Sequence, residues 1–301
     1  KDRRGSFPPS ALLFAVFNLF LERKSIKKNF YALRGVLIPF CAVWGIVMGC
    51  FYWNFRRFLC IRITIFTAPS ATTPRRLEHV DYGVKTVVNC DYAAYFAKLA
   101  EMREKYRGQI TIRAGIEFGV QLETIPEFTA AFQRWPFDFV IYSCHQADNQ
   151  EFWRNEFQAG RTQEEYQTAY YAAIYDVMCQ YKLYSVLGHL DMIKRYDPCG
   201  DYPDEKILPL AEKIMRQAIA DGKGIEVNTS TLRYGLPGTF PSRRLLELYH
   251  DLGGRILTIG SDSHDTAHLA DLIPEVQSLL KEIGFREICT FEHMEPVFHR
   301  L

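Results

Sequence analysis

Five short apolar runs in the second part of the chain follow one pattern, in which each run leads into polar residues or into residues of types that can bind a metal ion. β-Branched and aromatic residues dominate these runs, and stretches with helical periodicity separate them, as in folds that alternate strands and helices. Parallel strands of this kind present their carboxyl ends on one side of a sheet. The pattern therefore predicts an α/β fold, a β/α barrel with its site at the carboxyl ends of the strands. The five runs are 109–116, 137–142, 184–187, 224–227 and 255–259.

The last of these runs leads into a candidate site. Asp262 and His264 follow residues 255–259 and lie two positions apart. Their side chains point the same way if the chain stays extended, because side chains alternate along a strand. A carboxylate and an imidazole that converge in this way can hold a metal ion. The alternative is that Asp262 caps the next helix and His264 lies on the surface.

Helical patterns occupy the segments between and after the runs. They cover 92–106, 125–135, 163–181, 204–222, 241–252 and 266–284. Asp91 is a candidate N-cap for the first helix, and residues 162–165 form a capping box at the start of the third. After the last helix, residues 287–291 predict a final barrel strand.

Residues 1–76 form a basic, apolar segment whose fold the sequence does not indicate. Residues 1–70 contain eleven Lys and Arg, two acidic residues and no His. Residues 35–55 carry no charge, and 21 such residues are enough to cross a bilayer as a helix. Two interpretations stay open: a membrane-spanning anchor at 35–55, or a sequence artefact such as a misjoined start.

Composition excludes some partners and compartments. The net charge of +1 provides no general attraction to nucleic acid, so no nucleic-acid partner is predicted. The eight Cys contain no C-x-x-C pair, which is typical of reduced thiols in a cytosolic protein. The predicted location is therefore cytoplasmic, with membrane anchoring through 35–55 as the alternative. The sequence does not indicate an oligomeric state.

An ordered set of short motifs covers residues 77–301. It comprises 78–83, 115–117, 137–141 with Ser143 and His145, 187–191, 194–196, 224–230, 233–235 and 260–264. Together these motifs resemble the histidinol-phosphatases of the PHP superfamily. The resemblance implies a distorted (β/α)7 barrel and metal-dependent hydrolysis of L-histidinol phosphate to L-histidinol and phosphate, a step of histidine biosynthesis.

The resemblance also implies a trinuclear set of metal ligands. One divalent ion would use Glu117, His145 and His189, a second would use Glu117 and Asp262, and a third would use His79 and His264. Of these residues, Glu117, Asp262 and His264 are also the predicted catalytic residues.

Three further His of the family pattern have no counterpart, because residues 1–78 contain no His. The first strand and helix of the barrel are therefore expected to be missing or replaced. We favour the artefact interpretation of residues 1–76, because a replaced first strand would leave an open sheet edge. We also expect fewer than the family's three ions, which would be Zn, Mn or Fe, and impaired activity.

Arg195, Arg233 and Asn228 are the predicted substrate-binding residues. A guanidinium in a loop after a barrel strand can hold phosphate through paired hydrogen bonds. Asn228 is either a substrate contact or a turn residue, and Asp191 is a candidate acceptor for the ring of His189. The expected partner is a small phosphorylated substrate, L-histidinol phosphate. The alternatives are a PHP phosphoesterase with another small phosphomonoester, or an impaired binding protein tethered to a membrane.

Overall fold

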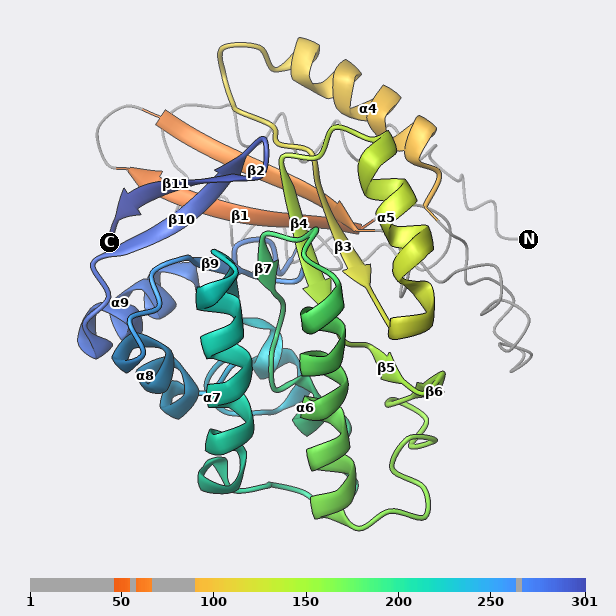
Figure 1. Ribbon diagram of the computed structural model, residues 1–301. Coiled ribbons are helices and arrows are strands. Elements are labelled where there is room, and N and C mark those ends of the chain that lie inside the picture. The colour runs from red at the N-terminus through yellow and green to blue at the C-terminus, as the bar shows by residue number, and fades with distance from the viewer. Residues whose placement is uncertain (1–45, 55–57, 67–89, 264–266) are drawn as a thin grey trace, which may run out of the picture.

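A five-stranded parallel sheet forms the centre of the computed structural model, which describes residues 46–54, 58–66, 90–263 and 267–301 (Figure 1). Its strands follow the chain in the order β3, β4, β7, β8 and β9, and each neighbouring pair is parallel. The strands are β3 (Gly115–Gly119), β4 (Phe139–Ser143), β7 (Val186–Leu187), β8 (Gly224–Asn228) and β9 (Leu257–Gly260). The predicted α/β fold with its five successive strands is therefore confirmed, although four of the five strands, all except β8, are shorter than the apolar runs.

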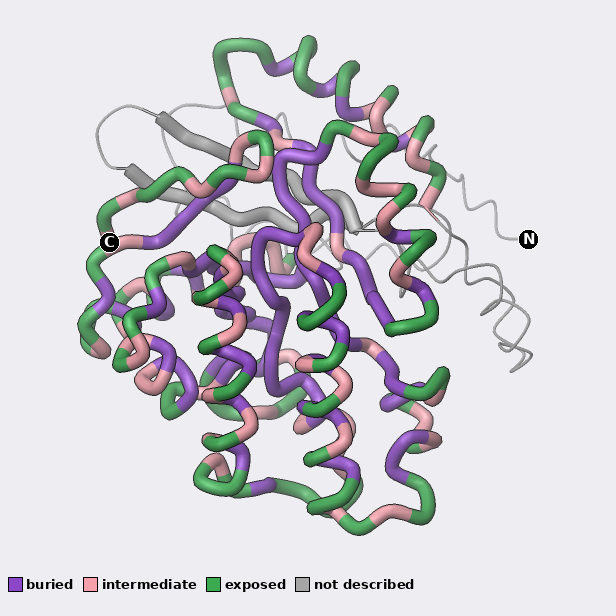
Figure 2. The backbone as a smooth tube through the Cα atoms, viewed as in Figure 1, coloured by how far each residue is buried: buried purple, intermediate pink, exposed green. Residues whose placement is uncertain are grey.

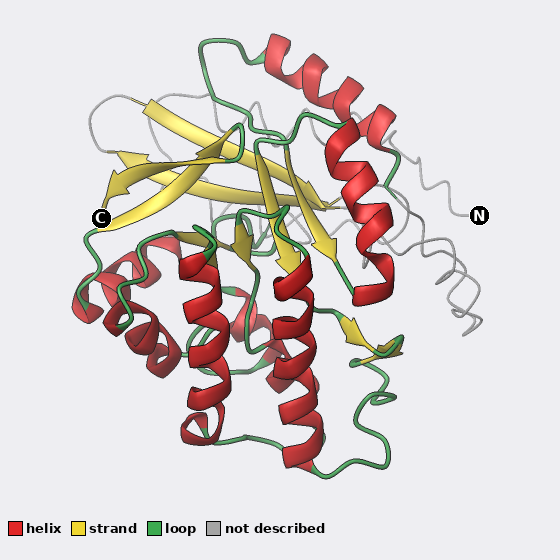
Figure 3. Ribbon diagram, in the orientation of Figure 1, coloured by secondary structure: helices red, strands yellow, loops and turns green. Residues whose placement is uncertain are grey.

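Six α-helices are described, at the positions where the helical patterns lie (Figure 3). They are α4 (Tyr92–Lys105), α5 (Ile125–Arg134), α6 (Gln163–Gln180), α7 (Asp204–Ala220), α8 (Arg243–Asp251) and α9 (Ile273–Ile283). Both predicted start signals are confirmed: Asp91 accepts a hydrogen bond from the Ala94 amide at 2.9 Å, and Thr162 and Glu165 form a capping box. These caps satisfy amides that have no partner within the helix.

Helix α9 begins at Ile273 rather than at residue 266. Ala270 and Leu272 have φ values of 60° and 58°, in the left-handed region, which interrupts a continuous right-handed helix. Pro274 lies in the first turn, where its missing N–H has no helical partner to lose. The longer apolar pattern therefore includes a turn that precedes the helix.

The loops at the carboxyl ends of the strands contain short ordered elements. These are the 3-10 helices η2 (Leu122–Thr124), η3 (Met192–Tyr196) and η4 (Ser230–Tyr234), and the hairpin of β5 (Gln146–Ala147) and β6 (Gln150–Glu151). Helix η2 follows β3, η3 follows β7, η4 follows β8, and the hairpin follows β4. They gather at the edge of the sheet where the site is predicted.

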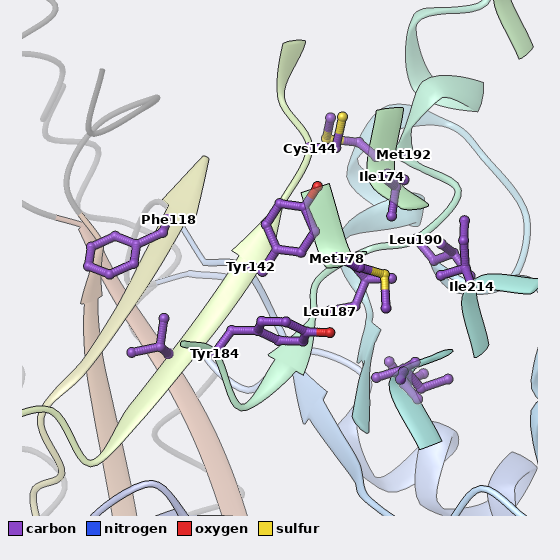
Figure 4. Close-up of a cluster of buried hydrophobic side chains, with 14 of the residues drawn as sticks. Phe118, Tyr142, Cys144, Ile174, Met178, Tyr184, Leu187, Leu190, Met192 and Ile214 are labelled. Carbon is purple, nitrogen blue, oxygen red and sulfur yellow. The ribbon is translucent and has the colours of Figure 1, made fainter. Parts of the chain in front are cut away.

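Packing on both faces fixes the strands of the sheet. Every residue of β4 is buried, as expected for a parallel strand that is covered on both sides (Figure 2). Figure 4 shows Tyr142 of β4 beside Tyr184, with ring centroids 5.6 Å apart, and close to Met178 of α6. Ile174 lies four positions before Met178, so both belong to the buried stripe of α6. This packing sets the position of the carboxyl end of β4.

The last predicted strand is present as β10 (Glu287–Glu292), which pairs antiparallel with β11 (Glu295–Arg300). His293 and Met294 have φ values of 51° and 68°, and such a two-residue turn returns the chain directly along the strand it has just left. Among the described strands, the hydrogen-bonded partner of β10 is thus β11 and not a strand of the parallel sheet.

A second hairpin, of β1 (Ile46–Asn54) and β2 (Phe58–Phe66), lies next to the sheet. Cα atoms of β2 come within 8 Å of β3, and Cα atoms of β1 come within 8 Å of β9, the two edge strands. The described part of the 35–55 stretch, 46–54, is therefore a strand, while 35–45 and 55 lie outside the described residues. Among the helices that the structure describes, none is long and apolar enough to span a membrane. That residues 1–76 stay outside the barrel remains a prediction.

Candidate metal centre

Glu117, His145 and His189 come together at the carboxyl ends of three neighbouring strands. Glu117 lies on β3, while His145 and His189 each follow the end of their strand, β4 and β7, by two residues. The Nε2 atoms of His145 and His189 are each 3.1 Å from the same oxygen, Oε1 of Glu117. The ligand atoms of the three residues all lie within 4.8 Å of one another. One carboxylate and two imidazoles at this spacing suit a zinc ion with further coordination positions open.

The local charges favour the ionised form of Glu117. Burial alone would raise the pKa of this carboxyl, but the charges and hydrogen bonds of His145 and His189 hold the pKa well below its usual range. The Ser143 hydroxyl also donates to Oε1 of Glu117. An ionised carboxylate with two oxygens is the group that a metal ion requires at this position.

Gly188 allows Ser143 to reach Glu117. A Cβ atom at position 188 would lie 2.6 Å from Oγ of Ser143 and 2.7 Å from Cγ2 of Ile141, closer than real Cβ contacts. Glycine at this position therefore lets the end of β7 pass close to the end of β4. This close approach brings His189 beside Glu117.

Asp191 does not contact the ring of His189, contrary to its proposed role as an acceptor for that ring. Its Oδ2 accepts a hydrogen bond from the Ser242 amide at 3.1 Å and lies 3.3 Å from Nζ of Lys194. Asp191 thus joins η3 to the start of α8. The Nδ1 atoms of His145 and His189 are buried and have no hydrogen-bond partner among the described residues.

Glu226 is a buried carboxyl beneath the centre that the sequence reasoning missed. Its Oε2 accepts hydrogen bonds from the His189 amide at 3.3 Å and from Nδ2 of Asn228 at 3.2 Å. Burial, together with the charges of Asp262 and Glu117, raises the pKa of Glu226 to about 8. The sequence contains one signal for this role, because a carboxylate is unusual inside an apolar run such as 224–227. Side chains alternate along a strand, so Glu226 lies on the same face as Asn228, a predicted site residue.

Asp262 lies at the same end of the sheet, just after β9. It has a φ of 47°, and its Oδ2 is 3.9 Å from Nη2 of Arg195. Arg233 donates from Nη1 to the carbonyl oxygen of Ser261 at 2.8 Å and from Nη2 to that of Asp262. Arg233 thus holds the loop that carries Asp262. Two other predicted ligands, His79 and His264, lie outside the described residues.

Arg195 lies beside this loop, and Asn228 is the last residue of β8. The Arg195 side chain is 7% exposed, and its Nη2 donates to Oγ of Ser230 at 2.7 Å. The ring of Tyr234 covers the guanidinium at 3.8 Å. The buried Nε of Arg195 has no hydrogen-bond partner among the described residues, so the guanidinium has capacity for an anion. Asn228 is buried, and its side chain bonds to Glu226 and Ser230.

Comparison with known proteins agrees with this geometry. The PHP domain family matches residues 76–230. A histidinol-phosphatase of Lactococcus lactis is 31% identical over 208 residues, which cover 67% of this chain and 76% of that protein.

Two solved structures are also similar. Histidinol phosphate phosphatase from Lactococcus lactis, in complex with zinc, L-histidinol and phosphate, has a TM-score of 0.63 and 28% identity, covering 77% of this chain and 95% of that chain. A structure from Listeria monocytogenes has a TM-score of 0.50 and 19% identity, covering 59% and 73% of the two chains, and shares the fold.

Proposed function

We propose that this chain, which belongs to the PHP domain family, hydrolyses L-histidinol phosphate to L-histidinol and phosphate. The observation that carries the proposal is the convergence of Glu117, His145 and His189 at the carboxyl ends of adjacent strands. The similar Lactococcus lactis structure holds zinc, L-histidinol and phosphate, which are the metal and products of this reaction. Metal ligands and an anion-binding arginine at one sheet edge suit a phosphomonoester.

We assign one zinc ion to Glu117, His145 and His189. The choice of zinc over manganese or iron rests on the two imidazoles and on the zinc in the Lactococcus lactis structure. A second ion would share Glu117 and use Asp262, and a third would use His79 and His264. When bound, such ions hold the phosphate and lower the pKa of bound water.

The residues of the chain itself would orient the substrate. Arg195 is buried, carries a fixed positive charge and has donor capacity left, so it would bind the phosphate oxygens. Arg233 would contribute from η4, where it also donates hydrogen bonds to the backbone at Ser261 and Asp262. Asn228 is buried, so it would contribute from beneath the substrate, through its hydrogen bonds to Glu226 and Ser230.

The proposal is tested with the full chain loaded with zinc, L-histidinol phosphate and a panel of other small phosphomonoesters. We expect the highest kcat/KM for L-histidinol phosphate. His145→Ala removes one of the three ligands, so kcat/KM should fall at least about 100-fold, and zinc affinity should fall with it. Arg195→Lys should instead raise KM, because an ammonium cannot make paired contacts with phosphate.

His250→Ala is the matched control, because His250 lies on α8 against Gly284, away from the three ligands. It should keep the kinetic constants of the original chain. A higher kcat/KM for another phosphomonoester would contradict the substrate assignment. Unchanged zinc affinity in His145→Ala would contradict the metal assignment.

A further inference from the structure

A chain of hydrogen bonds runs beneath the site from the end of β7 to the start of η4. Glu226 accepts from the backbone amide of His189 at 3.3 Å and from Nδ2 of Asn228 at 3.2 Å. Oδ1 of Asn228 in turn accepts from the amide of Ser230 at 2.9 Å and from its hydroxyl at 2.6 Å. Nη2 of Arg195 donates to the same hydroxyl oxygen at 2.7 Å. The hydrogen bonds therefore connect His189, a proposed metal ligand, to Arg195, which is proposed to bind the phosphate.

The chemistry of these groups fixes the direction of every hydrogen bond. A guanidinium and a backbone amide can only donate, so Oγ of Ser230 accepts from Arg195 and Oδ1 of Asn228 faces the Ser230 amide. The single hydroxyl proton of Ser230 is then left for Oδ1 of Asn228. Nδ2 of Asn228 consequently points to Glu226, which matches the observed contact.

The network is shielded from solvent. Ser230, Asn228 and Glu226 are at most 2% exposed, and the Arg195 side chain is 7% exposed. Hydrogen bonds in such surroundings are strong, and a broken one leaves a costly unsatisfied group. Both the oxygen and the nitrogen of the Asn228 side-chain amide are therefore hydrogen-bonded within the protein, to Ser230 and Glu226.

The aromatic contacts of Arg195 restrain the plane of its guanidinium but not the rotation of the group within that plane. The rings of Tyr234 and Phe240 lie 3.8 Å and 5.3 Å from the guanidinium carbon. Stacking restrains the plane of a guanidinium but tolerates rotation within that plane. The hydrogen bond to Ser230 at 2.7 Å restricts this rotation more closely than the Asp262 carboxylate, whose Oδ2 lies 3.9 Å from the same Nη2. We infer that it sets the direction in which the other N–H groups of Arg195 point.

We propose that Ser230 and Asn228 are positioning residues that aim the guanidinium of Arg195 at the phosphate and set its distance from His189. The proposal rests on the proposed function, in which Arg195 binds the phosphate group. It gives Asn228 a role that needs no contact with the substrate.

A double-mutant cycle tests the proposal with the zinc-loaded full chain and inorganic phosphate as the probe. Phosphate affinity is measured by calorimetry for the original chain, Ser230→Ala, Arg195→Ala and the double variant. Ser230→Ala should weaken phosphate binding about tenfold, the effect of losing one hydrogen bond to a charged group. The double variant should bind phosphate as weakly as Arg195→Ala alone, because Ser230 acts through Arg195.

Further measurements separate positioning from a general loss of structure. Zinc affinity should be unchanged in Ser230→Ala, because the network meets His189 at its backbone and not at its ring. Asn228→Ala should also weaken phosphate binding, and adding Ser230→Ala to it should have little further effect. Ser278→Ala is the matched control, since its hydroxyl donates to the carbonyl of Pro274 on the exposed side of α9. It should leave phosphate binding unchanged.

Additive effects of Ser230→Ala and Arg195→Ala would overturn the proposal, as would unchanged phosphate affinity in Ser230→Ala or no phosphate binding by the original chain. Weaker zinc binding in Ser230→Ala would also overturn it. A chain that binds phosphate and shows the coupling, yet does not hydrolyse L-histidinol phosphate, would contradict the proposed substrate and leave the positioning role supported.

Discussion

Oε1 of Glu117 is the atom on which the candidate metal centre converges. Two imidazole nitrogens lie 3.1 Å from it, and the Ser143 hydroxyl donates to it. The hydroxyl contact restrains the carboxylate independently of the two imidazoles, so it would help to hold Glu117 in place with a metal ion bound to His145 and His189. Ser143 thus supports the centre although it supplies no metal ligand.

We predict that Gly188→Ala weakens zinc binding about tenfold, the usual range for loss of a group that orients a ligand. The added Cβ would lie 2.6 Å from Oγ of Ser143 and would force this hydroxyl away from Glu117. Overpacking should also lower the free energy of unfolding by about 1–3 kcal/mol. Competition with a fluorescent chelator measures the first effect, and denaturation in urea measures the second.

Gly224→Ala is the control for this prediction. Its Cβ would lie 2.1 Å from the carbonyl oxygen of Ile256, at the start of β8 and away from the metal ligands. It should destabilise the protein with little change in zinc affinity. Equal loss of zinc affinity in both variants would show that the effect of Gly188→Ala comes from general instability.

Among single residues, the sequence predicts that Glu117, His145 and His189 come together, but it does not predict the contacts of the residues around them. Glu117, His145 and His189 follow apolar runs, and the convergence of parallel strand ends places them together. Glu226 lies within such a run, and only the packing of β7 against β8 shows that it meets the His189 amide. Asp191 lies two positions after His189, but its side chain points to the amide of Ser242, which is 51 residues away in the sequence.

Among the secondary-structure elements, Asp138 at the start of β4 connects several parts of the fold. Its Oδ2 accepts hydrogen bonds from Arg103 of α4 at 2.8 Å and from the Ala114 amide before β3 at 2.7 Å. Its Oδ1 accepts from the amide of His293, in the turn between β10 and β11, at 3.1 Å. Asp138 is buried, so these contacts compensate for the water that it loses.

We predict that Asp138→Ala lowers the free energy of unfolding by about 2–3 kcal/mol, because it leaves buried amides and a guanidinium without an acceptor. Urea denaturation followed by circular dichroism measures the loss. Zinc affinity should change little, since Asp138 lies at the amino end of β4 and the ligands lie at the carboxyl ends. Asp251→Ala, at the exposed end of α8, is the control and should unfold like the original chain. A stable Asp138→Ala variant would show that these contacts contribute little.

The order and type of the main elements follow from the sequence, while their limits and the added hairpins do not. Hydrophobic periodicity predicts the six helices, the five strands of the parallel sheet and β10, but not β1, β2, β5, β6 or β11. The caps at Asp91 and Thr162 mark helix starts correctly. The pattern at 266–284 cannot reveal that Leu272 takes a left-handed conformation, because periodicity does not report backbone angles. The partner of β10 likewise depends on the conformation of the turn at His293 and Met294.

For the molecule as a whole, we predict that the chain binds fewer than three zinc ions. The resemblance implies nine ligands, and residues 77–301 supply six of them, while residues 1–78 contain no His. A metal ion held by two protein ligands binds weakly, because water must fill the other positions. Metal analysis after dialysis against zinc counts the bound ions.

The comparison is a variant in which a His-x-His start replaces the residues before Leu77. This variant should bind more zinc and hydrolyse L-histidinol phosphate faster than the original chain. Three bound zinc ions and an equal rate for the original chain would refute our interpretation of residues 1–76.

The spacing of the triad along the chain determines when a metal ion can bind during folding. Glu117 and His189 are 72 residues apart in sequence, although their side chains lie 3.1 Å apart. Bringing them together in an unfolded chain costs loop-closure entropy, and β4 must lie between them in register. An ion therefore finds its ligands only after β3, β4 and β7 have paired. It follows that the ion would not speed folding but would slow unfolding of the native state.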